Sequence, residues 1–217
     1  MCKIIRVAID GPGGAGKSTA AKRIAEALDI EYVDTGAMYR AVAFKMKENG
    51  IGISDVDEIS EMLTDTDIDF SRGDIILDGK VINEYIRTPE ISKLASDCSA
   101  LSAVREKLVF LQRGMGGKKS VVMDGRDIGT NVIKDAECKI FMTASKEERA
   151  RRRYDEFVAK GRNTSLDEVL KEITERDEND TTRALNPLRK ADDAIELDTT
   201  DMAIEEVCEF ILGIIKR

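Results

Sequence analysis

The chain has 217 residues, of which 42% are hydrophobic and 35% charged, enough to fold one domain with a substantial core. Its net charge of −8 argues against wholesale binding of nucleic acid. Neither a secretory signal nor a membrane span is expected, because MCKIIRVAID lacks the long apolar core of a signal and the apolar run FILGII is too short.

Strand and helix patterns alternate along the first 50 residues. The apolar run IIRVAI at 4–9 predicts a buried strand, and apolar residues at helical spacing over 18–28 predict a helix. EYVD at 31–34 predicts a second, short strand. A second helix is predicted over 39–48, ending near Asn-Gly at 49–50.

The region at about 63–87 interrupts this alternation. DIILDGKVI at 74–82 predicts a hairpin around Asp78-Gly79, a pair that favours the tight type I′ turn. We therefore expect an insertion with its own small antiparallel sheet. Pro89 then stands where a first helical turn is expected, and the helical pattern continues to about residue 112.

The second half of the chain returns to alternating elements. The predicted strands are 120–124, 138–144 and 194–198, and the predicted helices are 146–160, 166–178 and 202–216. Strands that alternate with helices predict a parallel sheet covered by helices on both faces.

A glycine-rich stretch, GPGGAGKST, follows the first strand and opens the first helix. Its spacing fits GxxxxGK[ST], in which backbone N–H groups and the helix N-terminus hold phosphates. Lys17 is expected to reach the β and γ phosphates, and Ser18 to bind Mg²⁺. The residues expected to bind ATP are Gly11, Pro12, Gly13, Gly14, Ala15, Gly16, Lys17, Ser18 and Thr19.

Arginines are clustered although the chain as a whole is acidic. RARRR covers 149–153, further arginines follow, and histidine is absent. Phosphoryl transfer needs charge stabilisation more than proton chemistry, so this pattern favours an enzyme whose acceptor is itself a phosphate. Because histidine is absent, no group of the enzyme is expected to titrate near neutrality.

Five segments, in this order, resemble the bacterial cytidylate kinases, a family of nucleoside monophosphate kinases: GPGGAGKST, DTGAMYR, IRTPE, DGRDIGT and ERDENDTTR. The resemblance covers nearly the whole chain, and DGRD together with ERDxxD is its most specific part. It implies an α/β fold of the P-loop NTPase type with five parallel strands. The implied regions are a core (1–40, 88–148 and 164–217), a monophosphate-binding insertion (about 41–87) and a helical lid (about 149–163).

The resemblance also implies the reaction, which is transfer of a phosphoryl group from ATP to CMP and dCMP with Mg²⁺. We expect a cytoplasmic monomer that binds neither nucleic acid nor membrane. Kinases of UMP, AMP or a shikimate-like acceptor remain alternatives, as does a non-catalytic nucleotide switch. A GTPase is disfavoured because the guanine-reading NKxD is missing.

Roles for individual residues follow from the resemblance. Arg40 and Arg126 would hold the acceptor phosphate, with Arg183 beside it. The residues facing cytosine would be Ser96, Arg105 and Asp127, and those holding the ribose would be Arg176 and Asp180. The expected catalytic set is Lys17, Arg126, Arg152, Arg153 and Arg183, and the substrate-binding set also includes Thr35 and Tyr39.

Several residues keep a second interpretation at this point. Asp124 could position Mg²⁺ through water, the favoured role, or act as a structural acceptor. Asp34 could cap the next helix and Thr35 could serve only a turn. Asp127 could simply pair with Arg126 or cap the next segment. Arg149 and Arg151 are expected on a solvated helix face. The cysteines (Cys2, Cys98, Cys138 and Cys208) form no CxxC pair, so reduced thiols are expected.

Overall fold

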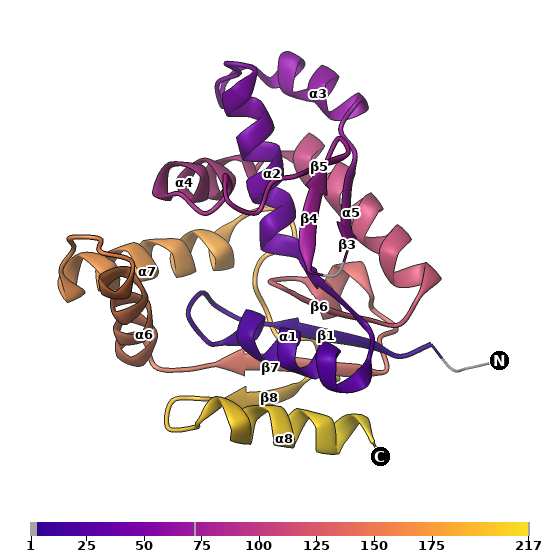
Figure 1. The fold of residues 1–217 in the computed structure, drawn as a ribbon, viewed down its shortest axis with the longest axis vertical. Helices are drawn as coiled ribbons and strands as arrows, with labels where there is room; N and C mark the ends of the chain where they lie inside the picture. Colours follow the sequence, from indigo (N-terminus) through magenta and orange to yellow (C-terminus); the bar gives the residue numbers. More distant parts are fainter. Residues whose placement is uncertain (1–3, 72, 217) are drawn as a thin grey trace.

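The computed structural model describes residues 4–71 and 73–216, and a five-stranded parallel sheet lies at its centre (Figure 1). The strand order is β2-β6-β1-β7-β8. Each neighbouring pair is parallel, so the predicted parallel sheet is confirmed. The strands are β1 (Arg6–Asp10), β2 (Glu31–Asp34), β6 (Val121–Gly125), β7 (Cys138–Thr143) and β8 (Ile195–Asp198).

Alternate side chains of β1 explain why helices cover both faces of the sheet. Val7 and Ile9 belong to one apolar cluster and Ala8 to another, since successive side chains of a strand point to opposite faces. The helices α1 (Lys17–Leu28) and α8 (Ile204–Ile215) supply the first cluster, and α2 (Thr35–Glu48) and α5 (Ser102–Lys118) supply the second. Figure 1 shows α8 on one side of the sheet and α2 and α5 on the other.

The expected insertion is a three-stranded antiparallel sheet, so the predicted hairpin is confirmed. Its strands are β3 (Ile68–Ser71), β4 (Asp74–Leu77) and β5 (Lys80–Val81). Asp78 and Gly79 have φ angles of 49° and 79°, the two positive values that a type I′ turn requires. Alternate residues such as Ile68 and Phe70 are buried in the same core as α2 and α5.

The helices differ from the predictions at several points. The second helix, α2, begins at Thr35 rather than at 39, because Asp34 Oδ1 accepts the Ala37 N–H at 2.8 Å and caps the helix directly after β2. An unpredicted helix, α3 (Val56–Thr64), buries Ile59, Met62 and Leu63 at helical spacing.

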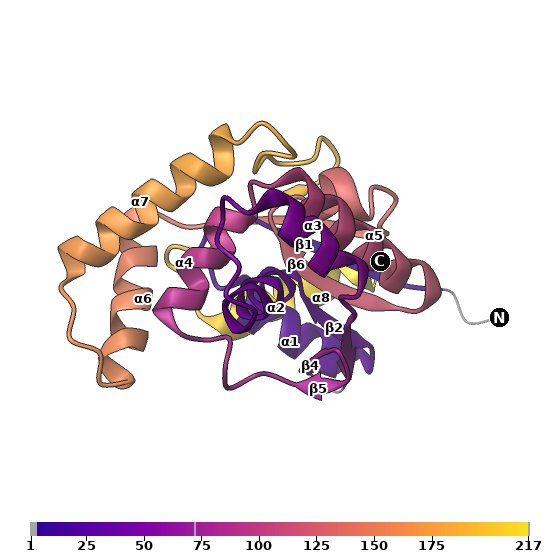
Figure 2. The same cartoon turned by 90° about the horizontal axis from the view of Figure 1, so that it is seen from above.

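The helical pattern from 89 onwards forms two helices rather than one. The first is α4 (Pro89–Cys98), and the Leu101 N–H donates to the Cys98 carbonyl at 3.0 Å in the turn before α5. This break places α4 and α5 on either side of α2 (Figures 1 and 2), so that both helices bury apolar residues in one core.

The two consecutive helices between β7 and β8 stand beside the sheet and pack on each other. The helices α6 (Lys146–Ala159) and α7 (Leu166–Thr182) share a small apolar cluster of their own, built on Ala150, Val169 and Ile173. A single π-helical turn, η1 (Ile128–Val132), follows β6.

Across residues 4–71 and 73–216, none of the helices combines the length and the apolar character needed to cross a bilayer.

Candidate active site

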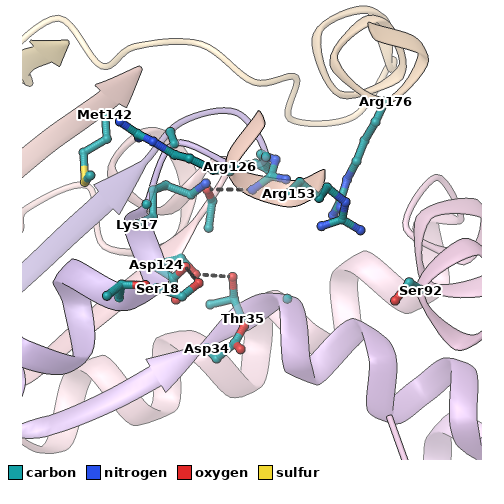
Figure 3. A pocket seen from close by; sticks show the side chains of 18 of the residues that line it. Lys17, Ser18, Asp34, Thr35, Ser92, Asp124, Arg126, Met142, Arg153 and Arg176 are labelled. Atoms are coloured by element: carbon teal, nitrogen blue, oxygen red, sulfur yellow. Dashed lines mark hydrogen bonds between the residues drawn. The ribbon is translucent and has the colours of Figure 1, made fainter. Parts of the chain in front are cut away.

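A cavity of about 1210 Å³ opens at the carboxyl ends of the central strands. This volume exceeds the ~300–1,000 Å³ usual for one small ligand, so two nucleotides can be accommodated. Figure 3 shows Lys17, Arg126, Arg153 and Arg176 directed into the same space, with Ser92 of α4 on the wall opposite Ser18.

The glycine-rich loop has the backbone that its spacing predicts. Gly11, Gly14 and Gly16 have φ angles of 142°, 80° and 87°, values that side chains rarely allow. A Cβ added at Gly11 would lie 1.9 Å from the Met142 carbonyl oxygen, so β7 leaves room for glycine alone. Gly16 is the N-cap of α1, which directs the positive end of this helix at the loop.

Lys17 lies at the base of the loop and is 5% exposed. Its Nζ donates to the Pro12 carbonyl at 2.7 Å. Burial, followed by repulsion from Arg126, lowers the pKa of Lys17 to about 7, while Asp124 acts in the opposite direction. The expectation that no enzyme group titrates near neutrality is therefore wrong, because desolvation moves a lysine into that range.

Asp124, at the end of β6, is surrounded by hydroxyl donors. Ser18 Oγ donates to its Oδ2 and Tyr32 Oη to its Oδ1, both at 2.8 Å. The Thr35 hydroxyl donates to the Asp124 carbonyl at 2.7 Å. Burial, and then the charge of Asp34, raises the pKa of Asp124. Tyr32 was not identified from the sequence, where it is one apolar residue of a strand.

The oxygen pair of Ser18 and Asp124 meets the needs of Mg²⁺. This ion prefers hard oxygen ligands and keeps several waters, so it uses only one or two side chains besides substrate phosphates. Within the described part of the chain, no three His, Cys, Asp or Glu side chains cluster as a metal site. Since Mg²⁺ needs few protein ligands when substrate phosphates supply the others, the two oxygens of Ser18 and Asp124 suit a metal that arrives with a nucleotide.

Asp127 is the centre of a buried charge network. Its Oδ2 accepts from Arg105 at 2.8 Å and from Asn131 at 3.1 Å, and its Oδ1 accepts from Arg183 at 3.3 Å. Arg105 is 2% exposed and lies 5.7 Å from the ring centre of Tyr39. The alternative that Asp127 pairs with Arg126 is wrong, because Arg126 turns to another partner.

That partner is Asp180 on α7, whose Oδ2 accepts from Arg126 Nε at 2.6 Å. Although burial opposes ionisation, Arg126 and Arg176 hold the pKa of Asp180 below its ordinary value. Burial and the charge of Arg126 lower the pKa of Arg176 to about 10. The helix extends to Thr182, so Arg176 and Asp180 share one of its faces, as their spacing of four predicts.

The remaining predicted residues line the same cavity, Ser96 among them. Arg40 donates to Asp34 at 3.0 Å, and its Nε has no hydrogen-bond partner among residues 4–71 and 73–216. Arg152 is engaged by Glu148 and by the Thr199 carbonyl, at 2.9 and 2.6 Å. Arg153 instead lies 4.9 Å from the ring centre of Phe157, with burial lowering its pKa.

The expectation for Arg149 is wrong, and that for Arg151 is confirmed. The Arg149 side chain is 4% exposed and pairs with Asp177 at 2.6 Å, whereas the Arg151 side chain is 64% exposed. The sequence predicts polar helix surface at both positions, but only Arg149 faces the phosphate loop. The described cysteines are free and buried, namely Cys98, Cys138 and Cys208, whereas Cys2 lies outside the described residues.

Asp10, at the end of β1, was also missed by the sequence analysis. Its two carboxylate oxygens accept the N–H groups of Ile128 and Gly129, each at 2.7 Å. These bonds tie the segment that carries Asp127 to the strand that leads into the phosphate loop. Burial raises the pKa of Asp10 to about 6 even though both hydrogen bonds lower it.

The raised pKa of Asp10 predicts a dependence of stability on pH. Between its ordinary pKa of 3.8 and about 6, the folded state binds more protons at this site than the unfolded chain. The free energy of unfolding should therefore fall as pH rises through this range, by about 3 kcal/mol for this carboxyl. In urea titrations, the free energy of unfolding of Asp10→Asn should depend less on pH than that of wild type. The control Asp57→Asn, at an exposed position of α3, should behave like wild type. If the free energy of unfolding changes equally with pH in all three proteins, the raised pKa of Asp10 is contradicted.

Comparisons with known proteins agree with this geometry. A family model described as cytidylate kinase matches residues 7–217. The chain is 52% identical to the cytidylate kinase of Carboxydothermus hydrogenoformans, over 98% of each chain. It is 50% identical to that of Clostridium perfringens, over the whole of both chains, and 49% identical to that of Clostridioides difficile, over 95% and 96%.

Comparison with solved structures shows which known folds this chain resembles. Shikimate kinase from Bacteroides thetaiotaomicron has a TM-score of 0.53 at 14% identity, over 99% of this chain and 100% of the other. An uncharacterized protein from Eubacterium ventriosum has a TM-score of 0.54 at 16% identity, over 99% of each. At such identities the likeness concerns the fold alone, and it confirms the predicted P-loop NTPase-type sheet with flanking helices and a small β insertion.

Proposed function

The chain belongs to the cytidylate kinase family, and on this premise we propose how its cavity transfers a phosphoryl group from ATP to CMP or dCMP. The observation that carries the proposal is one cavity with a phosphate loop on one side and the cations Arg126, Arg153 and Arg176 facing it. Two anionic substrates repel each other, and such cations relieve the repulsion and stabilise the charge of the transition state.

A coupled assay with ATP and each of CMP, dCMP, UMP and AMP tests this function. We expect CMP and dCMP to be the preferred acceptors. Preference for UMP or AMP would favour another monophosphate kinase, and ATP binding without transfer to any acceptor would favour a nucleotide switch. The charge network around Asp127 supports an acceptor that carries a polar base.

ATP is placed with its phosphates on residues 11–19. The N–H groups of the loop and the N-terminus of α1 hold the anion, and Lys17 leaves the Pro12 carbonyl to contact the β and γ phosphates. Ser18 and Asp124 would hold Mg²⁺, which supplies positive charge to the phosphate oxygens. Because Lys17 is buried, an arriving anion also restores its full charge.

The acceptor nucleotide is placed across the cavity. Arg126, Arg40 and Arg183 face its phosphate, and the Nε of Arg40, which has no hydrogen-bond partner among the described residues, supports this role. Asp127 and Arg105 face the cytosine, together with Ser96, while Thr35 and Tyr39 complete this wall. Arg153 is the stronger candidate for the transferring phosphoryl group, since Arg152 is already bound to Glu148 and Thr199.

The proposed lid covers about 149–163, and the proposed monophosphate-binding insertion about 41–87. The apolar cluster beneath α6 is separate from the two clusters of the sheet, which supports movement of the lid segment relative to the sheet. Closure over both nucleotides would exclude water, which competes as an acceptor. The proposal also includes a cytoplasmic monomer that binds nucleotides rather than nucleic acid, in keeping with the net charge of −8.

Asp180 is proposed to accept a hydrogen bond from the ribose 2′-OH. Replacing Asp180 by alanine should lower kcat/KM with both substrates, because Arg126 loses its partner at 2.6 Å. The loss should be greater with CMP than with dCMP, by about 3- to 100-fold, since only CMP loses the 2′-OH bond.

Steady-state kinetics with the two substrates measure this ratio, and Asp180→Asn, which keeps one acceptor oxygen, should retain more of the preference. Asp155→Ala is a control, because this residue is exposed on α6. If Asp180→Ala lowers both substrates by the same factor, Asp180 serves to orient Arg126 and does not contact the sugar.

A further inference from the structure

Arg149 and Asp177 form a buried ion pair that belongs to none of the residue sets assigned above. Arg149 lies in the second turn of α6 and Asp177 on the facing side of α7. The guanidinium donates to both carboxylate oxygens, with Nη2–Oδ2 at 2.6 Å and Nη1–Oδ1 at 3.1 Å. The two side chains are 4% and 15% exposed. A bidentate, charge-assisted pair of this kind fixes geometry as well as distance.

The remaining donors of Arg149 reach the phosphate loop and the end of β7. Its Nη1 also donates to the Gly13 carbonyl at 3.0 Å, and its Nε donates to the Ala144 carbonyl at 3.0 Å. The loop rests directly on α6, since a Cβ added at Gly14 would lie 3.0 Å from Arg149 Cβ. The orientation of the Gly13 peptide, within the loop that cradles phosphates, therefore depends on this arginine.

On α7, Asp177 lies among residues that face the acceptor. Arg176 precedes it directly, and Asp180, which holds Arg126, follows three positions later. The α6–α7 pair has its own apolar cluster, separate from the two clusters of the sheet. Its position over the cavity therefore depends on polar ties such as the one that Arg149 makes to Gly13.

We propose that Arg149, held in place by Asp177, is a positioning residue that keeps the phosphate loop and the cavity-facing side of α7 in one geometry. It contacts neither reacting group, and it sets the donor and the acceptor sites together. The inference rests on the proposed function, which places ATP on the loop and the acceptor beside α7. Weakening the pair should therefore lower kcat/KM for both substrates, since ATP is placed on one wall of the cavity and the acceptor on the opposite wall.

Two variants weaken the pair in different ways. Asp177→Asn keeps the shape but loses the charge, and Arg149→Lys keeps the charge but loses the planar fork. For each, kcat/KM should fall with respect to ATP and with respect to CMP, by about tenfold or more. Arg151→Lys on α6 and Glu175→Gln on α7 are matched controls from exposed ion pairs, and we expect them to stay within about twofold of wild type.

A double variant separates positioning from stability. Asp177→Asn leaves the buried Arg149 without its counter-charge and can destabilise the fold, whereas Arg149→Met with Asp177→Leu removes both charges. Thermal unfolding should show the double variant to be at least as stable as either single variant, and its kinetic defect should remain. If the folded double variant regains wild-type kinetics, the pair is only structural and the proposal is overturned.

A loss confined to ATP or confined to CMP would also overturn the proposal, because the two sites would then not be set together. This failure is distinguishable from failure of the proposed function. The proposed function is judged on which acceptor the wild-type protein phosphorylates, and the inference is judged on the ratio of each variant to wild type for both substrates.

Discussion

Replacing Lys17 by methionine should lower kcat/KM by about 10²- to 10³-fold, while the protein becomes more stable. The activity falls because a fixed positive charge next to the β and γ phosphates is lost, and single groups that stabilise developing charge are typically worth about 3–4 kcal/mol. The fold is retained because methionine fills a similar volume beneath the loop, where Lys17 is 5% exposed.

The gain in stability follows from the depressed pKa of Lys17, from 10.5 to about 7. Over this range the folded state binds fewer protons at Lys17 than the unfolded chain, so the free energy of unfolding rises with pH up to the ordinary value. Below about pH 10 the buried lysine thus lowers the stability of the fold, and at pH 8 its removal should raise the free energy of unfolding by about 1–3 kcal/mol. In the variant, the free energy of unfolding should also no longer rise with pH on account of this residue.

Urea unfolding at pH 7 to 10 and steady-state kinetics test both effects in one variant. Lys118→Met, at an exposed position in the last turn of α5, is the control, and it should change neither quantity. Near-normal turnover of Lys17→Met would refute the assignment of this lysine to the phosphates. If the variant is less stable than wild type at pH 8, burial of the charged Lys17 does not destabilise the fold.

Replacing Asp127 by asparagine should lower kcat/KM with CMP by about 10²-fold or more and narrow the preference for CMP over UMP. Cytosine presents an amino donor where uracil presents an oxygen, and an ionised carboxylate can only accept. Its two oxygens offer about four acceptor positions, of which Arg105, Asn131 and Arg183 use three, so one remains for the base. Asparagine adds a donor that suits uracil, and sites of this type discriminate strongly.

The same substitution leaves the buried Arg105 without its counter-charge, and Arg183 keeps only its pair with Asp180 at 3.6 Å. A loss of about 3–5 kcal/mol in stability is expected on breaking a buried pair, so the kinetics must be measured well below the unfolding temperature. Asp97→Asn, from the exposed pair with Lys93, is the matched control. If the rates with CMP and UMP fall by the same factor, Asp127 does not read the base, and Ser96 and Arg105 are the next residues to test.

Features built from contiguous residues could be predicted from the sequence. The loop GPGGAGKST needs glycines at given positions of one short segment, and its backbone has the predicted positive φ angles. The hairpin is equally local, because Asp78 and Gly79 alone determine its turn. The parallel sheet follows from the alternation of elements. Helix ends were less well predicted: the Asp34 cap was foreseen as one interpretation, but the start of α2 was placed at 39 instead of 35, and the break before α5 was missed.

The pairing of charges was decided only by the tertiary structure. Arg126 and Asp127 are neighbours in the chain, yet Arg126 binds Asp180 while Asp127 binds Arg105 and Arg183. Partners so distant in the chain meet because β6, α5 and α7 converge at one end of the sheet, which no local pattern encodes. Burial acts in the same way, since it distinguishes Arg149 from Arg151 and lowers the pKa of Lys17. Desolvation depends on everything packed around a group, so residue types and spacing alone do not determine it.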